Sequence, residues 1–171
     1  NRCFMDCTGH VKFDWLEQSI GQWAFRNTWN IPKEIVVKKR EGYTASNWLG
    51  WGAFVNTCVE KIDLRESPIT GVDSCGRDPE SMSSSNNEQS PAVQQPFYGA
   101  VKLKHLLLPR NMTNIPAWSI ARLSALETLV LPENVVTIRQ YAIFDNQWIK
   151  TIETPDTLET LEQYAFASNA S

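Results

Sequence analysis

The sequence predicts a solenoid in which turns of about 23 residues stack along one axis, with a parallel sheet on one face and short helical or 3₁₀ turns on the other. The first observation behind this prediction is a regular interval: Ile115, Ile138 and Leu161 stand 23 residues apart, and Leu49 precedes Val72 by the same 23. The second is a set of apolar positions at matching offsets in three consecutive repeats, and the third is a proline after the expected strand in those repeats, at Pro109, Pro132 and Pro155. One such turn cannot bury its apolar side alone, so the turns are expected to share a continuous core.

One short strand per turn is expected on the sheet face. The segment 126–131 (LETLVL) has apolar residues three and then two positions apart, and Pro132 follows it directly. Because strand side chains alternate between faces, Leu129 would point inward and Val130 outward. Equivalent strands of successive turns must pair in parallel and in register. The proline has no N–H to donate to the ladder, so it is expected to end each strand.

The rest of each turn carries two further signals. A second apolar pair, such as Val135 and Ile138, predicts another extended segment on the opposite wall. A small residue followed by a large apolar one, as in Ala24-Phe25 and Ala142-Ile143, predicts a tight helical or 3₁₀ turn. The small residue would let neighbouring turns approach, and the large one would fill the core.

Two turns are longer than the period. Six residues are added between Ile20 and Leu49, around 38–48, and a polar insertion rich in Ser and Asn occupies 73–95. Insertions in solenoids form loops and leave the stack intact. We therefore expect one domain over 1–171, made of about five full turns plus partial turns at both ends, with a projecting loop at 73–95. Neither end shows a polar capping repeat, so the chain is expected to be a fragment of a longer array or to have its ends covered by a partner.

Composition excludes several classes of function. The chain has 171 residues, of which 42% are hydrophobic and 20% charged, the balance of a soluble, core-forming protein. Its net charge of −3 argues against a general nucleic-acid binder, which needs many cations to neutralise phosphates. No stretch approaches about 18 consecutive apolar residues, so no membrane span is expected. The sequence starts at Asn1 without a signal peptide, and we expect any targeting segment to have been removed.

No enzymatic or metal-binding motif stands out. The sequence lacks a phosphate-binding loop ending in Gly-Lys-Ser/Thr, an HExxH motif and a GxSxG motif, and its two histidines lie in distant repeats. Cys3 and Cys7 do not have the spacing of a zinc-ligand pair. Cys58 is interpreted either as a small buried hydrophobic residue or as one half of a disulfide with Cys75. We therefore expect no enzyme activity, no cofactor and no metal.

The stretch LETLVLPENVVTIRQYAIF resembles the leucine-rich repeat of BspA-like surface proteins, whose unit reads roughly L-x-x-I-x-L-P-x-x-V-x-x-I-G-x-x-A-F-x-x-C. The resemblance continues in IKTIETPDTLETLEQYAF and covers the chain apart from the insertions, most strongly over 97–166. Ile120 and Ile143 replace the Phe of the motif, and its Gly remains only as Gly21 and Gly50. The resemblance implies a strand-rich α/β leucine-rich-repeat solenoid. It also implies a bacterial cell-surface or secreted adhesin that binds host matrix proteins or other cells, with no catalytic residues to carry over.

The outward positions of the strands are the first candidate for a binding site, because stacked repeats present their sheet as an extended surface. The candidate residues are Glu34, Lys61, Asp63, His105, Leu107, Thr128, Val130, Thr151 and Glu153. An ordinary sheet surface is the alternative, since much of any protein's exposed area is apolar.

Aromatic residues provide the second candidate. Tyr43, Trp48 and Trp51 surround the six-residue insertion beside Gly and Asn, a combination found in glycan sites and protein hot spots. The alternative is that the two tryptophans cover a bulged turn. A separate column, expected either to stack turn on turn or to form a platform for a ligand, comprises Trp23, Trp118, Tyr141 and Tyr164.

Three functions follow from these observations. The first is a non-enzymatic cell-surface or secreted adhesion module that recognises a host or extracellular-matrix protein through the solenoid surface. The second, motivated by seven Trp, is a carbohydrate-binding surface protein that uses exposed Trp and Tyr. The third is a spacer segment of a larger surface protein, or a fragment of a multi-domain enzyme. The expected location is extracellular or on a bacterial cell surface.

Overall fold

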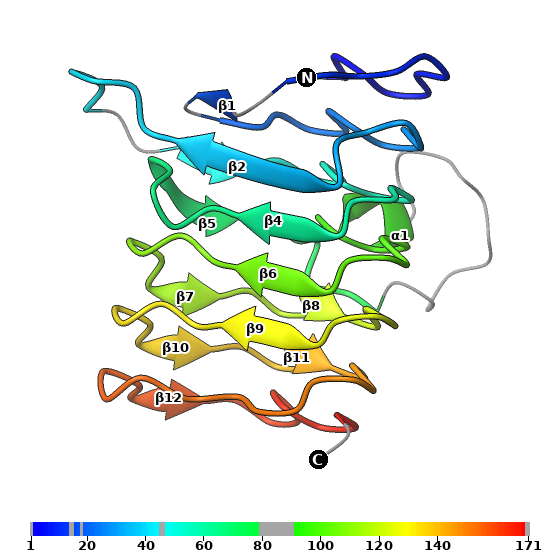
Figure 1. Cartoon of the computed structure of the whole chain (residues 1–171). Coiled ribbons are helices and arrows are strands. Elements are labelled where there is room, and N and C mark those ends of the chain that lie inside the picture. Colours follow the sequence, from blue (N-terminus) through cyan, green and yellow to red (C-terminus); the bar gives the residue numbers. More distant parts are fainter. Residues whose placement is uncertain (1, 14–15, 18, 45–46, 79–90, 170–171) are drawn as a thin grey trace.

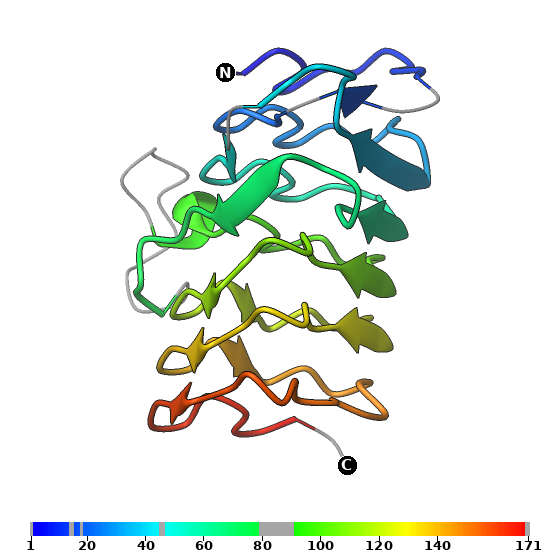
Figure 2. The same cartoon turned by 90° about the vertical axis from the view of Figure 1, so that its left-hand side faces the viewer.

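The computed structural model describes residues 2–13, 16–17, 19–44, 47–78 and 91–169 of the chain. These residues wind into turns that stack along one axis, with the first residues at one end and the last at the other (Figure 1). Seen from the side, the strands form separate walls around a shared interior (Figure 2). The predicted solenoid of parallel strands is therefore confirmed.

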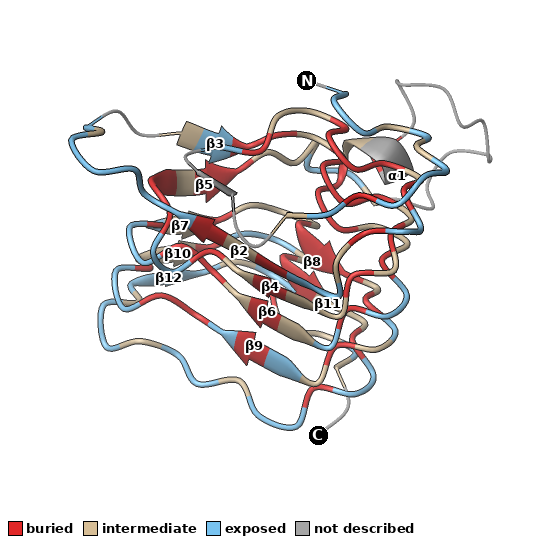
Figure 3. Cartoon of the chain, turned by 45° about the horizontal axis from the view of Figure 1, so that its top comes forward, coloured by how far each residue is buried: buried red, intermediate tan, exposed pale blue. Residues whose placement is uncertain are grey.

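The largest wall is a five-stranded parallel sheet, the main sheet. Its strands are, in order, β1 (Leu16–Glu17), β2 (Glu34–Lys38), β4 (Lys61–Asp63), β6 (His105–Leu107) and β9 (Thr128–Val130). The inward residues Ile62, Leu106 and Leu129 lie opposite one another in successive strands, and all three are buried. Figure 3 shows the same alternation within β9, where a buried residue stands between two exposed ones. The period of 23 thus places equivalent side chains in register.

The predicted second extended segment forms the opposite wall, here called the second wall. Its strands are β3 (Asn47–Leu49), β5 (Ile69–Val72), β7 (Asn114–Ile115), β10 (Thr137–Ile138) and β12 (Thr160–Leu161). β3 pairs with β5, and β10 pairs with both β7 and β12, in each case in parallel. In Figure 1 β5, β7, β10 and β12 lie one below another behind the main sheet. The four turns from β2 to β10 are therefore extended on two walls.

The helical or 3₁₀ turns predicted around the small–large pairs are not confirmed. Two of these segments are instead the short strands β8 (Ile120–Ala121) and β11 (Ile143–Phe144), which pair in parallel. The physical reason is where the backbone N–H groups donate. Those of Phe25, Ile120 and Ile143 donate to carbonyls of the next turn at 2.9 Å, so they are not available for a helix within their own turn. In the described part of the chain the one α-helix is α1 (Pro91–Gln94).

The strands β8 and β11 form a third wall, and left-handed residues mark its corners. Trp118 and Tyr141 have φ of 61° and 54°, and Arg122 and Asp145, four residues further on, have φ of 58° and 56°. Two such corners turn the chain into the wall and out of it again. Few residues other than glycine adopt this conformation readily, so the surrounding turns must hold it in place.

The large residues of the small–large pairs stack along the inside of the solenoid. The rings of Phe4, Phe25, Phe54 and Phe97 have successive centroid distances of 5.4, 5.5 and 6.1 Å. The small partner Ala53 is fully buried between the turns. The pair thus has the role that the sequence predicted, although the backbone around it is not helical.

The two insertions leave the stack continuous. The first ends in β3, which joins the second wall beside β5. The prediction of a projecting loop falls mainly on 79–90, which lie outside the described residues. Its two ends are fixed by hydrogen bonds: the Ser74 hydroxyl lies 2.6 Å from Gln95 Oε1, and Gln95 Nε2 donates to the carbonyl of Arg77 at 2.8 Å.

Candidate functional site

The outward residues of the main sheet and of the turn beyond it, named above as the first candidate, are here called the strand face. Its first row begins with Glu34 and Lys61, whose side chains form an ion pair at 2.5 Å across neighbouring strands. His105 and Thr128 continue the row in register. Exposed ion pairs of this kind contribute little to stability. The register of the strands thus brings Glu34, Lys61, His105 and Thr128 together on one surface.

The second row of the strand face changes from charged to apolar. It runs from Asp63 through Leu107 to Val130, which lie opposite one another in successive strands. Arg65 Nη2 lies 2.7 Å from Asp63 Oδ2, and its Nε donates to the other carboxylate oxygen at 3.0 Å. These hydrogen bonds from Arg65 lower the pKa of the Asp63 carboxyl, although partial burial acts against them. Asp63 is thus an ionised carboxylate that is already paired with Arg65, and it lies in the same row as the apolar residues Leu107 and Val130.

Val130 is the most prominent apolar residue of the strand face, with 43% of its surface exposed. It lines two shallow hollows, one of about 280 Å³ shared with Thr128 and Thr151, and one of about 320 Å³ shared with Arg110 and Glu133. Its neighbour Leu107 is half-buried. The face therefore offers an apolar centre with a recess on either side.

The predicted strand through Thr151 and Glu153 does not form. The main sheet ends at β9, and within the described ranges no backbone hydrogen bond joins residues 151–153 to it. The earlier strands are anchored by two inward residues, as by Leu129 and Leu131. In the last turn the second anchor is Thr154, which is exposed, so Ile152 holds this segment alone. The two candidate residues consequently lie beyond the sheet, across the hollow of about 280 Å³.

The aromatic cluster of Tyr43, Trp48 and Trp51 lies in and beside β3, and not on the strand face. Trp48 is in β3, with its ring against Gly71 of β5, and 55% of it is exposed. The register between β3 and β5 shifts beside it, which fits the bulge considered from the sequence. Asn47 Nδ2 donates to the Tyr43 hydroxyl at 2.9 Å. Among the described residues no ring stacking joins the three aromatics, and of the three Trp48 alone is exposed.

The aromatic column is a ladder over three turns. Trp118 stacks on Tyr141 with a centroid distance of 4.4 Å, and Tyr141 stacks on Tyr164 at 5.1 Å. Trp23 does not join this ladder. Gly52 stands at the equivalent position of the next turn, with φ of 58°, and leaves a gap in the column. The column thus mainly packs neighbouring turns of the third wall against one another.

All four cysteines are free, so the disulfide between Cys58 and Cys75 considered from the sequence does not form. Cys75 lies beside Gln95, whose Nε2 is 3.3 Å from the Cys75 sulfur. Burial raises the pKa of the Cys75 thiol. Cys58 lies near Trp29 and Lys102 in a different groove. In the part of the chain that the structure describes, no cluster of three or more His, Cys, Asp or Glu could hold a metal ion.

The groove beside Cys58 was missed by the sequence analysis. It is a hollow of about 600 Å³ where the chain enters β2 and β4, and here it is called the basic groove. The charged and aromatic residues that line it include His10, Lys12, Trp29, Lys33, Glu60 and Lys102. A usable signal existed in the repeat alignment: Asn30, Cys58 and Lys102 each precede the buried residue that leads into a strand. The insertions between these turns hid it.

Repeated turns with an exposed parallel sheet define a solenoid repeat protein, a class of fold that presents an extended surface for binding. The family model described as BspA type leucine rich repeat region matches residues 81–171, in six copies. The match covers more than half of the chain, and the chain belongs to this family. The family is generally a non-enzymatic scaffold and is typically surface-associated.

A solved structure supports the fold. A leucine-rich repeat protein from Eubacterium ventriosum ATCC 27560 superimposes with a TM-score of 0.53 at 18% sequence identity, over 91% of this chain. This chain spans 43% of the length of that protein. No curated protein matches the sequence significantly. Among the described residues there is no helix whose length and apolar character would allow it to cross a membrane.

Proposed function

We propose that this chain is a non-enzymatic adhesion module, secreted or on the cell surface, that recognises a host or matrix protein through the strand face. The repeat fold and its family support protein interaction, and the surface association typical of the family supports the location. On this proposal residues 1–171 act as one domain. The observation that carries it is Val130, an exposed apolar residue between two recesses.

The surroundings of Val130 support this proposal, because their composition resembles that of a protein interface. Interfaces place apolar anchors at their centre and polar groups around the rim. Here Arg65 and Arg110 lie on one side of the apolar pair, and Glu133 and Glu153 lie beside the hollows. Arg110 already pairs with Glu66 at 2.8 Å. A partner that offers one apolar side chain to each recess and mixed charges around it would fit this surface.

The strand face can be tested by a binding screen of the purified chain against extracellular-matrix proteins. For a matrix protein that binds, Val130→Asp is expected to weaken binding at least about tenfold, because it places a charge at the desolvated centre. Lys61→Glu is expected to weaken it by only a few fold, because rim charges contribute less. Surface plasmon resonance would give both dissociation constants.

The matched control for this experiment is Leu161→Asp, because Leu161 is an aliphatic residue with 54% exposure on the opposite wall. It is expected to leave binding unchanged. The strand face is the wrong surface if Leu161→Asp reduces binding while Val130→Asp does not.

Carbohydrate binding is the second candidate function, and the position of Trp48 favours it. One face of the indole ring packs on Gly71, where an added Cβ would lie 3.0 Å from the ring, and the side chain is 55% exposed. A fixed ring with a free face is what a sugar ring needs for stacking.

A glycan array tests this second function. For a glycan that is retained, the soluble form is expected to change the Trp fluorescence, and Trp48→Ala is expected to abolish both the retention and the change. Trp148→Ala serves as the control, because Trp148 is 64% exposed in a distant turn. Equal losses for the two variants would count against Trp48. A folded chain that binds neither a matrix protein nor a glycan would favour the spacer interpretation.

A further inference from the structure

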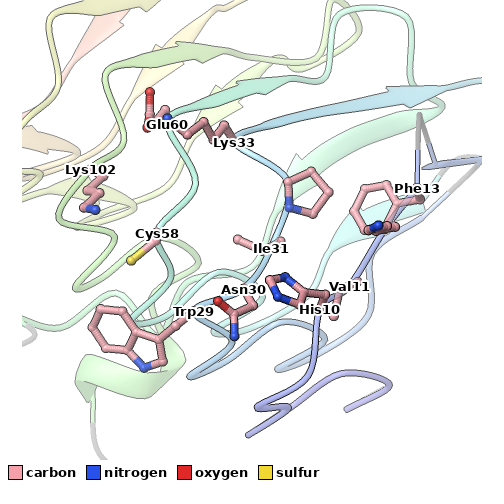
Figure 4. A pocket seen from close by; sticks show the side chains of 12 residues that line it. His10, Val11, Phe13, Trp29, Asn30, Ile31, Lys33, Cys58, Glu60 and Lys102 are labelled. Atoms are coloured by element: carbon pink, nitrogen blue, oxygen red, sulfur yellow. Dashed lines mark ion pairs between the residues drawn. The ribbon is translucent and has the colours of Figure 1, made fainter.

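The basic groove has an apolar floor and a charged rim. Val11 and Ile31 form buried parts of its lining, with 8% and 9% of their surfaces exposed. Trp29 stands at its side with 56% of its surface exposed. Figure 4 shows Trp29 and Lys102 on one side of the hollow and Phe13 on the other. The volume of about 600 Å³ falls in the range of known ligand pockets, about 300–1,000 Å³.

The rim of the groove is positive although the chain as a whole is negative. Three lysines, Lys12, Lys33 and Lys102, line it against one carboxylate, Glu60, which leaves two positive charges there. Lys33 Nζ lies 3.0 Å from Glu60 Oε1. Among the described residues no carboxylate pairs with Lys12 or Lys102. The hydrogen bond from Lys33 lowers the pKa of Glu60, and the charges of Lys104 and Lys102 add to this effect.

The lining favours a peptide over a saccharide. A bound saccharide needs a hydrogen-bonding partner for each hydroxyl group that it buries. Asn30 Nδ2 already donates to the carbonyl of Thr8 at 2.9 Å, and Glu60 is engaged by Lys33. An apolar peptide side chain needs no such partner and would lie on the floor near Val11, while acidic residues on either side would reach the lysines.

We propose that the basic groove binds an extended acidic peptide segment of a protein partner, with one apolar side chain placed between Trp29 and Phe13 and the flanking carboxylates at Lys102 and Lys12. This is a second contact site, separate from the strand face. It recognises charge and one apolar anchor, whereas the strand face recognises a surface of mixed charge.

The test uses the full chain and a labelled peptide of sequence Asp-Glu-Leu-Asp-Glu, followed by fluorescence anisotropy. Lys102→Glu is expected to weaken binding about tenfold, because it replaces an attraction by a repulsion. Trp29→Ala is expected to weaken it about fivefold through loss of the apolar contact. The affinity should also fall with added salt, because the charges are exposed. The counterpart Lys-Lys-Leu-Lys-Lys should not bind.

Two matched controls come from a later turn of the same stack. Lys150 occupies the position before the expected strand that Lys33 occupies before β2, and Trp148 is exposed like Trp29. Lys150→Glu and Trp148→Ala are expected to leave peptide binding within about twofold, as is Val130→Asp, so a failure of the strand-face proposal would not affect this result. The proposal is wrong if Lys150→Glu weakens binding as much as Lys102→Glu does. It is equally wrong if a heparin oligosaccharide binds the groove and the peptide does not.

Discussion

Replacing Gly50 by alanine is expected to lower the free energy of unfolding by about 3 kcal/mol, the upper part of the usual range for overpacking. A Cβ at this position would lie 2.4 Å from the backbone N of Gln22 and 2.6 Å from the carbonyl C of Gly21. These atoms belong to the backbone of the preceding turn and cannot rotate away, as a side chain could. The two turns would therefore have to separate, which would strain the hydrogen bond of 2.9 Å from Gly50 N to the carbonyl of Ile20.

Chemical denaturation followed by circular dichroism would measure this change. Gly9→Ala is the matched control, because no atom lies within 4 Å of a Cβ built at Gly9. Its effect should stay within about 0.5 kcal/mol. Similar losses for the two variants would show that the close approach of the turns at Gly50 is not what limits the substitution.

Phe54→Ala should be the most destabilising substitution in the core, with an expected loss of about 4 kcal/mol. Phe54 is fully buried, and its ring stacks on Phe25 at 5.5 Å and on Phe97 at 6.1 Å. Its removal leaves a cavity in the middle of the stack. Since a solenoid is stabilised mainly by contacts between neighbouring turns, the turns before and after Phe54 should then unfold in two steps instead of one.

The comparison variant is Phe4→Ala. Phe4 is 37% exposed, and within the described ranges it stacks on a single ring, that of Phe25, at 5.4 Å. Its loss should cost about 1 kcal/mol and leave the transition single. Calorimetry would separate the two cases. If both variants unfold in one step with equal losses, the phenylalanine stack does not couple the turns.

The arrangement of the walls could be predicted because the repeat imposes the same environment on equivalent residues. Leu106 and Leu129 are both buried in register, as their common offset indicated. The third wall could not be predicted as well, because a small–large pair such as Ala142-Ile143 does not reveal where its N–H groups donate. Those bonds go to the next turn, and only the assembled stack shows them.

The candidate sites likewise differ in how much of them the sequence predicted. Alternation within a strand was enough to identify Val130 as outward, and the structure leaves it 43% exposed. It was not enough to show that the sheet ends at β9, which depends on the polar Thr154 in place of a second apolar anchor. The basic groove was missed because Trp29, Cys58 and Lys102 come from turns of unequal length. Such a site depends on how turns align in space more than on any local motif.

The register of the stack has a consequence for how such a protein can change in length. Thr128 lies beside His105 in the neighbouring strand, and Thr137 lies beside Asn114. Positions 23 residues apart thus occupy equivalent places on their walls. Removal or duplication of one whole turn would join equivalent points and leave every interior column intact. The number of turns, and with it the reach of the outer surface, is thus free to vary by whole units while the interior stays under constraint. A change by whole turns would therefore alter the outer surface while the interior keeps its packing.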